Sequence, residues 1–392
     1  MASVLFAPGS WPRYVLSAIF FVITCMGMGI AALLILVPST ILYVFSKRAY
    51  REILRWAMHL LASWMVLITW ALAGPVEFVV SGDWDKLSKE DQVVMMSNHQ
   101  TYTDWWWIGL LAHMYCAQGT LYIILMNFMI FIPIIGQIMY LSGFIFLKQS
   151  WKKDKKLVQK RLQGMKAVGL PYWLLIFPEG TLNTPPGKKM SHEFAVKTGI
   201  SPEPVHVLLP RSTGLQFCCN KLRPELSALY DITIGYSGIA ADEVPYYKHL
   251  PTTVFFSGTG PRRVHFHIKR LDLDRIPGIS FGESRTSNTS SSNEDALKRG
   301  NSESTLNENH QESFNTWLRE RFYVKDKQMV TFFDYGEFMD DTDSGFRKEN
   351  SVSIKIKPTV WEWLSVITAI LLVWFIAGAI FYAIAALIMY LV

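Results

Sequence analysis

Three long stretches almost free of charged residues constrain this chain more than any other feature of its sequence. Residues 14–44 contain no charged side chain, residues 56–80 contain only Glu77, and residues 359–392 contain only Glu362. At 1.5 Å per residue the first stretch would form about 46 Å of helix, which exceeds the roughly 30 Å hydrocarbon core of a bilayer. We therefore expect membrane helices at both ends of the chain and a separate domain between them.

The path of these stretches through a bilayer is open. Gly27, Gly29 and Pro38 permit either a tilted span with an interfacial tail or a re-entrant hairpin in the first stretch. Gly378 permits a kinked single helix or a hairpin in the last one. A basic cluster at residues 47–55 separates the first two stretches, and positive-inside bias would place the central domain in the lumen if both crossed fully. We favour the alternative in which one of them dips or lies flat, so that a multi-pass protein keeps its central domain in the cytosol.

Composition agrees with a membrane location. Hydrophobic residues make up 50% of the 392 residues and charged residues only 18%, which is unusual for a soluble domain. The net charge of +6 would suit a nucleic acid or an anionic membrane surface. Because no nucleic-acid recognition motif accompanies the charge, we expect the membrane and no nucleic acid. None of the four cysteines has paired CxxC spacing, and we expect no metal site.

The central part of the chain, residues 81–278, reads as one α/β domain. Short runs rich in β-branched and aromatic residues alternate there with segments long enough for helices, which predicts a mixed sheet with flanking helices. The segment 121–146 is again free of charge but is broken by Pro133 and Gly136, so we expect a helix and a strand partly sunk in the membrane. The predicted strands are residues 92–97, 172–177, 206–209, 231–236 and 263–268.

The remainder of the chain divides by composition. Residues 279–312 are rich in Ser, Asn and Glu and contain few apolar residues, which predicts a disordered insert. The predicted units are N-terminal membrane segments at 1–80, the α/β domain at 81–278, the insert at 279–312, a C-terminal extension at 313–358 and a membrane anchor at 359–392.

A histidine and an aspartate directly follow the predicted strand 92–97. On one continuous helix the five-residue spacing of His99 and Asp104 would turn their side chains about 140° apart, so they can meet only across a strand-to-helix turn. Such a turn places Asp104 in the first turn of a helix, where a carboxylate is favoured and can accept the Nδ1 proton of the imidazole. Nε2 would then be free to act as a general base near neutral pH.

Two other interpretations of this pair stay open at this point. Asp104 can be a helix cap beside an unrelated surface histidine, or both residues can be metal ligands. The second has no further His or Cys cluster at ligand spacing to support it. His265 and His267 alternate along one predicted strand, where we expect them to face solvent and not a metal ion.

Two further motifs decide between these interpretations. Phe-Pro-Glu-Gly-Thr at residues 177–181 ends the predicted strand 172–177, and Val-Leu-Leu-Pro at 207–210 is followed by Arg211. His-x4-Asp followed by these motifs in this order resembles the glycerolipid acyltransferase family. The extended forms Asn-His-Gln-x3-Asp-Trp and Leu-Leu-Pro-Arg-x2-Gly are similar to the branch that acts on lysophosphatidylinositol, lysocardiolipin and lysophosphatidic acid.

The resemblance implies an α/β acyltransferase domain that transfers a fatty acyl group from acyl-CoA to a lysophospholipid hydroxyl at the endoplasmic reticulum membrane, with no bound cofactor. It implies His99 as general base and Asp104 as the carboxylate that orients it, and it leaves the oligomeric state open. We expect backbone amides near Gly180 and Thr181 to bind the oxyanion, unless that segment is only a turn. The residues implied in substrate binding are Asn98, Lys148, Gln149, Glu179, Gly180, Thr181, Pro210 and Arg211.

One position departs from the family pattern. The motif similar to residues 143–148 is normally followed by an Arg that is held to bind the acceptor phosphate, and this chain has Gln149 there. Gln149 cannot neutralise a phosphate, so Lys148, Lys152 or Arg211 would have to supply the charge. This substitution keeps open a non-catalytic lipid-binding protein on the same scaffold, and a membrane hydrolase that uses the same His and Asp is a third interpretation.

Overall fold

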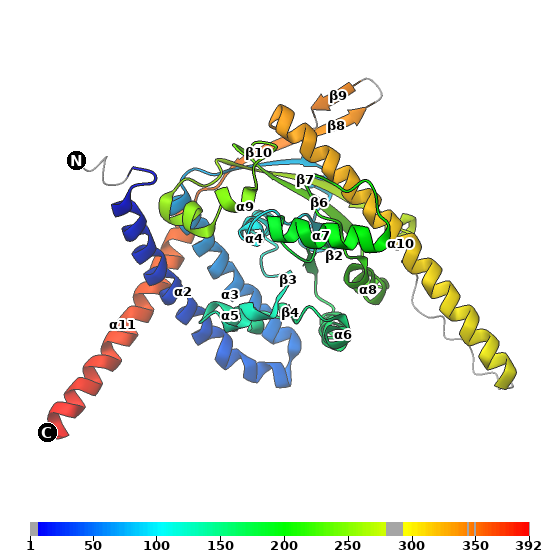
Figure 1. Ribbon diagram of the computed structural model, residues 1–392. Coiled ribbons are helices and arrows are strands. Elements are labelled where there is room, and N and C mark those ends of the chain that lie inside the picture. The colour runs from blue at the N-terminus through cyan, green and yellow to red at the C-terminus, as the bar shows by residue number, and fades with distance from the viewer. Residues whose placement is uncertain (1–6, 280–292, 343–344, 349, 392) are drawn as a thin grey trace.

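A central sheet surrounded by helices forms the body of the protein, and long apolar helices lie at one side of it (Figure 1). The expected mixed sheet with flanking helices, and the apolar helices near both ends of the chain, are confirmed. The computed structural model describes residues 7–279, 293–342, 345–348 and 350–391. Within these residues, three helices have the length and hydropathy of membrane spans: Trp11–Phe45, Lys47–Ala73 and Val360–Ala386.

The N-terminal helix is continuous. α2 (Trp11–Phe45) runs through Pro38 without a reversal, so the re-entrant hairpin considered for residues 14–44 is wrong. The chain reverses one residue after the helix, at Ser46, whose hydroxyl caps the N-terminus of α3 (Lys47–Ile68). The two apolar stretches of the N-terminal region therefore form a pair of antiparallel helices.

The C-terminal helix is also a single helix. α11 (Val360–Leu391) packs against both α2 and α3, and the hairpin considered at its centre does not occur. Gly27 of α2 allows the close approach, because an added Cβ there would lie 3.2 Å from both Ile370 and Trp374. A π-helical turn, η1 (Thr69–Ala73), continues α3 toward the sheet.

Strands and helices alternate between these membrane helices. The remaining helical elements are η2 (Trp84–Lys86), α4 (Asp104–Met114), η3 (Asn127–Phe131), α5 (Ile135–Leu141), α6 (Trp151–Val168), α7 (Pro185–Thr198), α8 (Ser212–Leu222), α9 (Pro245–Lys248), η4 (Thr252–Ser257), η5 (Leu273–Arg275) and α10 (Asn293–Tyr335). The strands are β1 (Glu77–Gly82), β2 (Gln92–Ser97), β3 (Leu121–Met126), β4 (Ile145–Leu147), β5 (Tyr172–Ile176), β6 (Ala228–Tyr236), β7 (Arg263–Leu271), β8 (Met339–Thr342), β9 (Gly345–Lys348) and β10 (Ser351–Lys355).

The central sheet has eight strands among the described residues, in the order β10-β1-β7-β6-β2-β5-β3-β4. β2 is parallel to both of its neighbours, β5 and β6, and β3 and β4 continue the parallel part. β7 runs antiparallel to β6, and β10 runs antiparallel to β1. Because β5, β2 and β6 are parallel, the loops after their carboxyl ends meet at one edge of the sheet, where α/β proteins usually place their sites.

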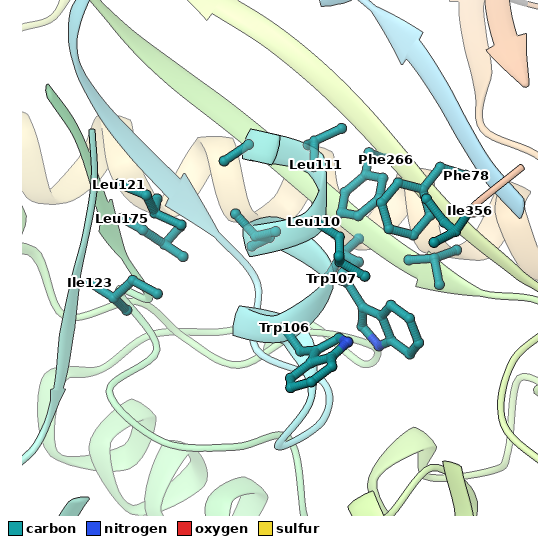
Figure 2. Close-up of a cluster of buried hydrophobic side chains, with 14 of the residues drawn as sticks. Phe78, Trp106, Trp107, Leu110, Leu111, Leu121, Ile123, Leu175, Phe266 and Ile356 are labelled. Atoms are coloured by element: carbon teal, nitrogen blue, oxygen red, sulfur yellow. The ribbon is translucent and has the colours of Figure 1, made fainter. Parts of the chain in front are cut away.

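Both faces of this sheet are covered. Along β2, Val93 and Met95 belong to one hydrophobic core, whereas Val94 and Met96 belong to the other, and all four are fully buried. α4 fills the first face and packs its tryptophans and leucines against the strands (Figure 2). α6, α8 and α10 cover the second face. A strand buried on both sides has a fixed register, so the residues that follow it start from a rigid position.

The predicted division of the chain at residue 313 is wrong. β10 pairs with β1, so the α/β domain begins at Glu77 and includes a strand from the C-terminal extension. α10 packs across the second face of the sheet. Residues 280–292 of the predicted insert lie outside the described residues, but the chain is helical from Asn293 onward, so the predicted disorder does not extend to residue 312.

A buried cluster of charges fixes α10 on the sheet. Asp231 of β6 accepts hydrogen bonds from Nε and Nη2 of Arg321 at 2.9 and 2.8 Å, and it also contacts the ammonium of Lys325. Burial lowers the pKa of Lys325, and the charge of Asp231 opposes that effect. Charges removed from water require such partners, so this cluster permits only one placement of the helix.

Two predicted segments differ from the structure. Residues 206–209 form no strand, because the amides of residues 205–207 donate to Oδ1 of Asp326 in α10 at 3.0, 2.6 and 3.3 Å. This carboxylate satisfies amides that would otherwise need a neighbouring strand. The segment 121–146 contains two short strands, with η3 and α5 between them, instead of one helix and one strand. The predicted strands 92–97, 172–177, 231–236 and 263–268 correspond to β2, β5, β6 and β7.

The solvent-facing orientation expected for His265 and His267 is wrong. The two residues are 1% and 5% exposed because α10 and the segment after it cover this face of β7. The His265 ring packs against Phe332 and Phe338, and His267 Nδ1 lies 3.2 Å from the Ser81 hydroxyl. Burial lowers the pKa of His265 to about 4, so this ring is neutral near pH 7.

Candidate active site

Three parallel strands deliver the candidate residues to one edge of the sheet. β2 ends two residues before His99, β5 ends immediately before Phe177, and the last residue of β6 is Tyr236. Neighbouring strands lie about 4.8 Å apart, so side chains from adjacent strand ends can touch. The strand order β5-β2-β6 places His99 between the other two.

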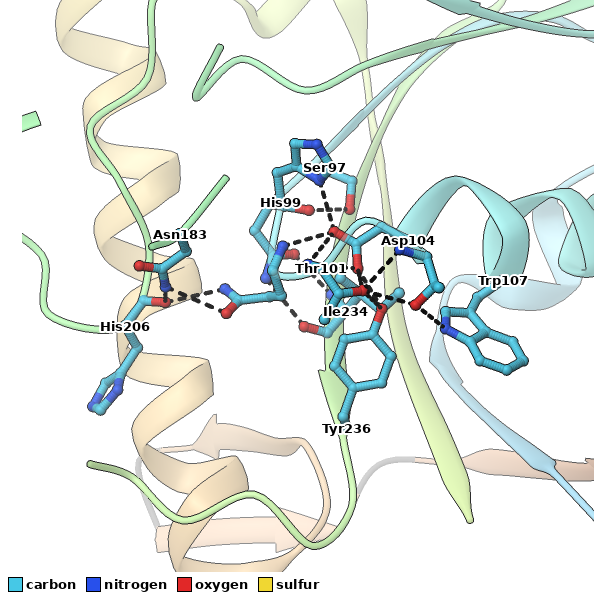
Figure 3. Close-up of polar contacts among 12 residues, drawn as sticks. Ser97, His99, Thr101, Asp104, Trp107, Asn183, His206, Ile234 and Tyr236 are labelled. Carbon is cyan, nitrogen blue, oxygen red and sulfur yellow. Dashed lines mark hydrogen bonds and ion pairs between the residues drawn. The ribbon is translucent and has the colours of Figure 1, made fainter. Parts of the chain in front are cut away.

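His99 and Asp104 are in direct contact (Figure 3). Nδ1 of the imidazole lies 2.8 Å from Oδ2 of the carboxylate, and the contact spans a strand-to-helix turn because α4 begins at Asp104. The predicted geometry is therefore confirmed. Asp104 is completely buried, whereas the His99 side chain is 19% exposed. Since an ionised carboxylate only accepts hydrogen bonds, Nδ1 carries the proton and Nε2, on the opposite side of the ring, keeps its lone pair.

Asp104 is surrounded by hydrogen-bond donors. Besides His99, Oδ2 accepts from the amides of Gln100 and Thr101 at 2.6 and 3.1 Å. Oδ1 accepts from the Thr101 amide at 3.2 Å, from its hydroxyl at 2.8 Å, and from the hydroxyl of Tyr236. Two of these donors are backbone groups of the turn itself, so the carboxylate cannot rotate without breaking the turn. The orientation of His99 is fixed in consequence.

The motif at residues 177–181 lies against the histidine. The Phe177 ring stacks on the His99 imidazole with centroids 4.2 Å apart and planes inclined by 20°. Glu179 is 3% exposed, and within the described residues neither of its carboxyl oxygens has a hydrogen-bond partner of standard geometry. Burial raises the pKa of Glu179 well above its ordinary value, although the backbone amides of His99 and Leu208 oppose the rise. Burial therefore favours the protonated form of this side chain.

The other residues expected in this part of the site are close together. Gly180 has a φ of 68°, and its amide donates to Phe177 O at 3.1 Å, so it closes a turn and is not available to bind an oxyanion. Thr181 lies half-buried in the same segment. The Arg211 amide donates to Pro178 O at 2.7 Å, which joins the segment after Pro210 to this turn.

Comparison with known proteins agrees with this arrangement. Residues 79–236 match the family model Acyltransferase, a range that contains the dyad and the 177–181 motif. The chain is 29% identical over 315 residues to the 2-acyl-1-lysophosphatidylinositol acyltransferase of Saccharomyces cerevisiae, with 72% of each chain covered. It is 32% identical over 270 residues to lysocardiolipin acyltransferase 1 of Danio rerio, which covers 67% of this chain and 65% of the relative. It is 28% identical over 302 residues to the probable 1-acyl-sn-glycerol-3-phosphate acyltransferase 5 of Arabidopsis thaliana, which covers 76% and 68%.

The chain contains an acyltransferase family domain, matched at residues 79–236. The resemblance carried by the three ordered motifs is thereby confirmed. The matched range ends at Tyr236, so α10 and β10 lie beyond it even though they complete the sheet and hold the segment before Pro210. The chain spans 65% to 72% of the lengths of the three relatives named here.

Asn98 of the acyltransferase does not face a substrate, and the structure corrects that expectation. The residue is fully buried, its Nδ2 donates to Ile234 O at 3.1 Å, and its Oδ1 accepts from the Ile234 amide at 2.8 Å. Both polar atoms are thus used to join the end of β2 to β6. Asn98 positions the turn that carries His99 and does not line the site.

Several positioning residues could not be identified from the sequence. Tyr236 is 2% exposed, and burial next to Asp104 raises the pKa of its hydroxyl well above the ordinary value, so it stays protonated as a donor. The backbone amide of Asn183 donates to His99 O at 2.9 Å, and its side-chain Nδ2 donates to His206 O at 2.7 Å. In the sequence, Asn183 is marked only by its position two residues after the 177–181 motif. Tyr236 is marked only by its place at the end of a predicted strand.

Lys148 and Gln149 lie at the same edge of the sheet but away from the dyad. They follow β4, which is three strands from β2, so about 14 Å separates the two strand ends at ~4.8 Å per strand. Both residues are exposed, and Gln149 has a φ of 58°. Asp154 of α6 fixes this turn by accepting hydrogen bonds from the amides of Lys148 and Ser150 at 3.0 and 2.9 Å. The exposed turn is thus open to a polar ligand at some distance from His99.

The structure gives little support for a metal site in the described part of the chain. No group of three or more His, Cys, Asp or Glu residues there is placed to hold a metal ion. His249 is buried with its ring 5.5 Å from that of Tyr236, and burial lowers its pKa to about 4. The absence of a bound cofactor stays a prediction.

An apolar cavity of about 250 Å³ adjoins the dyad turn. Tyr102 and Thr103, which precede Asp104, and Trp105 and Trp106, which follow it, form part of its wall. The rest of the wall comes from α2, α3, α5 and the segment around η4. The membrane helices therefore form part of the wall of a cavity that reaches the turn before Asp104.

Proposed function

We propose that this acyltransferase moves a fatty acyl group from acyl-CoA to the free hydroxyl of a lysophospholipid. The observation that carries the proposal is the 2.8 Å contact between His99 Nδ1 and Asp104 Oδ2, with the opposite face of a partly exposed imidazole directed away from the carboxylate. This arrangement suits a general base that needs no covalent intermediate. A thioester donor is already activated, so a positioned base and a site for the acyl chain are the main requirements.

In this mechanism Nε2 of His99 removes the proton of the acceptor hydroxyl while its oxygen attacks the thioester carbonyl carbon. Asp104 stabilises the imidazolium that forms. Collapse of the tetrahedral intermediate forms the new ester bond and breaks the carbon–sulfur bond. The imidazolium then returns its proton to the leaving thiolate, so CoA departs as the free thiol and His99 is regenerated.

Burial favours the neutral form of Glu179, which would support this step without adding a charge. A second carboxylate beside Asp104 would hold the imidazolium in a different orientation and would raise the cost of burial. A protonated Glu179 instead leaves Asp104 as the single charge that faces the imidazole.

For the acceptor we propose a lysophospholipid whose phosphate is a diester, as in the lysophosphatidylinositol and lysocardiolipin named for two of the relatives. A diester carries one negative charge, for which a Gln149 hydrogen bond and the nearby Lys148 ammonium suffice without the fork of an arginine. We further propose that the enzyme acts at the cytosolic surface of the endoplasmic reticulum membrane.

The test uses purified protein in detergent with labelled acyl-CoA and a panel of lysophospholipids and lysophosphatidic acid. We expect ester product with the wild type and a loss of roughly 10² to 10⁴ in kcat/KM for His99→Ala, the usual contribution of a general base. Gln149→Arg in the same panel should increase the preference for the monoester, lysophosphatidic acid, relative to the diesters.

Each other result has a definite meaning. No product with any acceptor would leave the lipid-binding interpretation, and free fatty acid formed without an acceptor would indicate a hydrolase. An unchanged acceptor preference in Gln149→Arg would contradict the proposed role of that turn while leaving the activity intact.

A further inference from the structure

A carboxylate in the middle of α10 is placed to hold a segment beside the dyad. Asp326 lies inside α10, which ends at Tyr335, so it caps neither end of the helix. Aspartate is a weak helix former in such a position, because its side chain competes for backbone hydrogen bonds. The carboxylate of Asp326 instead accepts hydrogen bonds from a segment 120 residues earlier in the chain. That distant partner, and not the helix, accounts for an aspartate at this position.

Three consecutive amides converge on one oxygen of this carboxylate. The amides of Val205, His206 and Val207 donate to Oδ1 of Asp326 at 3.0, 2.6 and 3.3 Å. Successive backbone N–H groups that point to one place form a binding site for an anion. The His206 ring also packs on Phe333 of the same helix, with ring centroids 4.9 Å apart. α10 thus fixes both the backbone and a side chain of the 205–207 segment.

The carbonyl oxygen of His206 ties this segment to the dyad turn (Figure 3). His206 O accepts from Nε2 of Gln100 at 3.1 Å and from Nδ2 of Asn183 at 2.7 Å. Nδ2 of Asn183 also donates to Oε1 of Gln100 at 3.3 Å. The two side chains are 1% and 4% exposed, so they depend on partners within the protein. Movement of the His206 carbonyl would therefore disturb both of them.

Gln100 and Asn183 are each connected to His99. The Gln100 amide donates to Oδ2 of Asp104 at 2.6 Å, and the same oxygen contacts His99 Nδ1. The Asn183 amide donates to His99 O at 2.9 Å. The histidine is thus held through its ring and through its backbone by two residues whose side chains converge on the same carbonyl. A continuous series of hydrogen bonds runs from α10 to the imidazole.

We propose that Asp326 is a positioning residue for acyl transfer, which keeps His99 in place through the 205–207 segment. This inference rests on the proposed acyl transfer. Asp326 lies outside residues 79–236, the range that matches the acyltransferase family model. A displacement of about 1 Å caused by a change remote from the chemistry can cost about 10²-fold in rate. A residue that touches no reacting atom can therefore determine how well the base works.

The experiment compares two substitutions of Asp326 in the full-length protein, purified in detergent and assayed with labelled acyl-CoA and a fixed lysophospholipid. Asp326→Ala removes the acceptor of the three amides, and kcat should fall by about 10- to 100-fold. Asp326→Asn keeps a carbonyl oxygen that can take the place of Oδ1, so it should retain most of the wild-type kcat. Recovery by asparagine would show that the acceptor oxygen matters and not the charge.

The effect should appear in kcat far more than in KM. The chain after the 205–207 segment has hydrogen bonds of its own, because the Leu209 amide donates to Ser191 Oγ at 3.1 Å and the Arg211 amide donates to Pro178 O at 2.7 Å. These contacts remain in Asp326→Ala, so KM should change by less than about threefold. A loss that lies entirely in KM would contradict the inference.

The matched control is Gln328→Ala, two residues later in α10. Oε1 of Gln328 accepts from the Thr233 hydroxyl of β6 at 2.8 Å, so this side chain also joins α10 to the sheet. Its removal should lower the unfolding temperature in detergent but leave kcat at the wild-type value. If Asp326→Ala does not fold, Asp326→Glu replaces it, because the longer side chain keeps the charge and moves the acceptor oxygen. A fall of about tenfold in kcat is then expected.

A double-mutant cycle tests the route through the His206 carbonyl. Asn183→Ala removes one of the two side chains that bind this carbonyl. If Asp326 acts through the same contacts, the combined variant should lose less kcat than the product of the two separate losses. Losses that simply multiply would contradict this route.

The outcomes separate this inference from the proposed function. A wild type that forms no ester product with any acceptor contradicts the proposed function. A wild type that forms product, with a folded Asp326→Ala variant that keeps its kcat, contradicts the inference alone. An equal fall in kcat for Gln328→Ala would also contradict it, because Asp326 would then act only by stabilising the fold.

Discussion

Two buried carboxyl groups of the candidate site have opposite surroundings: Asp104 in the turn after β2 and Glu179 in the turn after β5. Asp104 accepts hydrogen bonds from backbone amides, two hydroxyl groups and the His99 imidazole. Glu179 is buried to a similar degree, yet no described residue offers its oxygens a hydrogen bond of standard geometry, and burial raises its pKa well above the ordinary value. The same functional group thus accepts several hydrogen bonds in one turn, whereas in the other turn burial favours its neutral form.

The contrast shows that the donors supplied by the surrounding turn, and not the residue type, decide what a buried carboxyl group can do. The turn after β2 points its amides inward at Asp104. In the turn after β5 the Gly180 amide is used for the turn itself, and no described donor reaches Glu179 with standard hydrogen-bond geometry. Only Asp104 is then suited to hold an imidazolium, and three substitutions test that division.

The largest effect is expected for Asp104→Asn. Asparagine has one acceptor oxygen where aspartate has two, so it cannot accept hydrogen bonds from the imidazole and from all the turn amides. We therefore expect kcat/KM to fall by about 10³-fold. The amides of Gln100 and Thr101 lose part of their acceptor, so the free energy of unfolding should also fall by about 1–3 kcal/mol. Enzyme assays and thermal unfolding in detergent measure the two effects.

The matched control for this substitution is Asp83→Asn. Asp83 also accepts a backbone hydrogen bond, from the Arg270 amide at 2.9 Å, but it lies in the turn after β1, remote from the dyad. Comparable losses of activity in both variants would mean that Asp104 acts only by stabilising the fold.

An intermediate effect is expected for Tyr236→Phe, which removes one donor to Asp104 and leaves the turn intact. We expect kcat/KM to fall by about tenfold, the cost of one hydrogen bond to a charged group. The loss should appear in kcat and not in KM, because the imidazolium that Asp104 stabilises forms only during the reaction. The control is Tyr230→Phe on the same strand, which removes a hydroxyl that donates to Lys86 O at 2.7 Å. It should leave kcat/KM unchanged.

A fall in kcat/KM for Tyr236→Phe that comes from KM alone would assign this tyrosine a packing role only. The conservative change keeps the ring, so the comparison isolates the hydroxyl group.

The smallest effect on activity is expected for Glu179→Gln, because burial favours the neutral form of Glu179 and the glutamine amide is neutral as well. We expect a change of no more than about threefold at pH 7, in contrast to Asp104→Asn. Because the pKa of Glu179 is raised on folding, the wild type should lose stability as pH rises from the ordinary glutamate range toward the folded value. Glu179→Gln should lack this part of the slope, which unfolding temperatures over a pH series would detect. Equal slopes in the two proteins would contradict a protonated Glu179.

Motifs and periodicity were sufficient to predict part of this molecule. The strands β2, β5, β6 and β7 were predicted because their apolar runs are short and bounded by turn residues. The contact of His99 with Asp104 followed from a spacing that only a strand-to-helix turn can close. Such features depend on local geometry, so a single sequence is enough to predict them.

Other features depended on partners far along the chain and were missed. Residues 206–209 resemble a strand, but Asp326 of α10 takes their amides about 120 residues later. His265 and His267 alternate as a half-exposed strand would, and α10 buries them. The C-terminal extension looked separable because the sequence does not show that β10 pairs with β1.

The sequence by itself determined that this protein has membrane helices around an α/β domain. It also determined that a histidine and an aspartate meet in the turn after the strand at residues 92–97. Both follow from forces that act within about ten residues: the exclusion of charge from apolar helices and the turn that joins a strand to a helix. Only the tertiary structure decided which carboxyl group is surrounded by hydrogen-bond donors, which asparagine is structural, and that an apolar cavity adjoins the dyad turn. Each of these depends on burial and hydrogen bonds between segments that are distant in sequence, and the free energy of a buried polar group depends on whatever group lies opposite it.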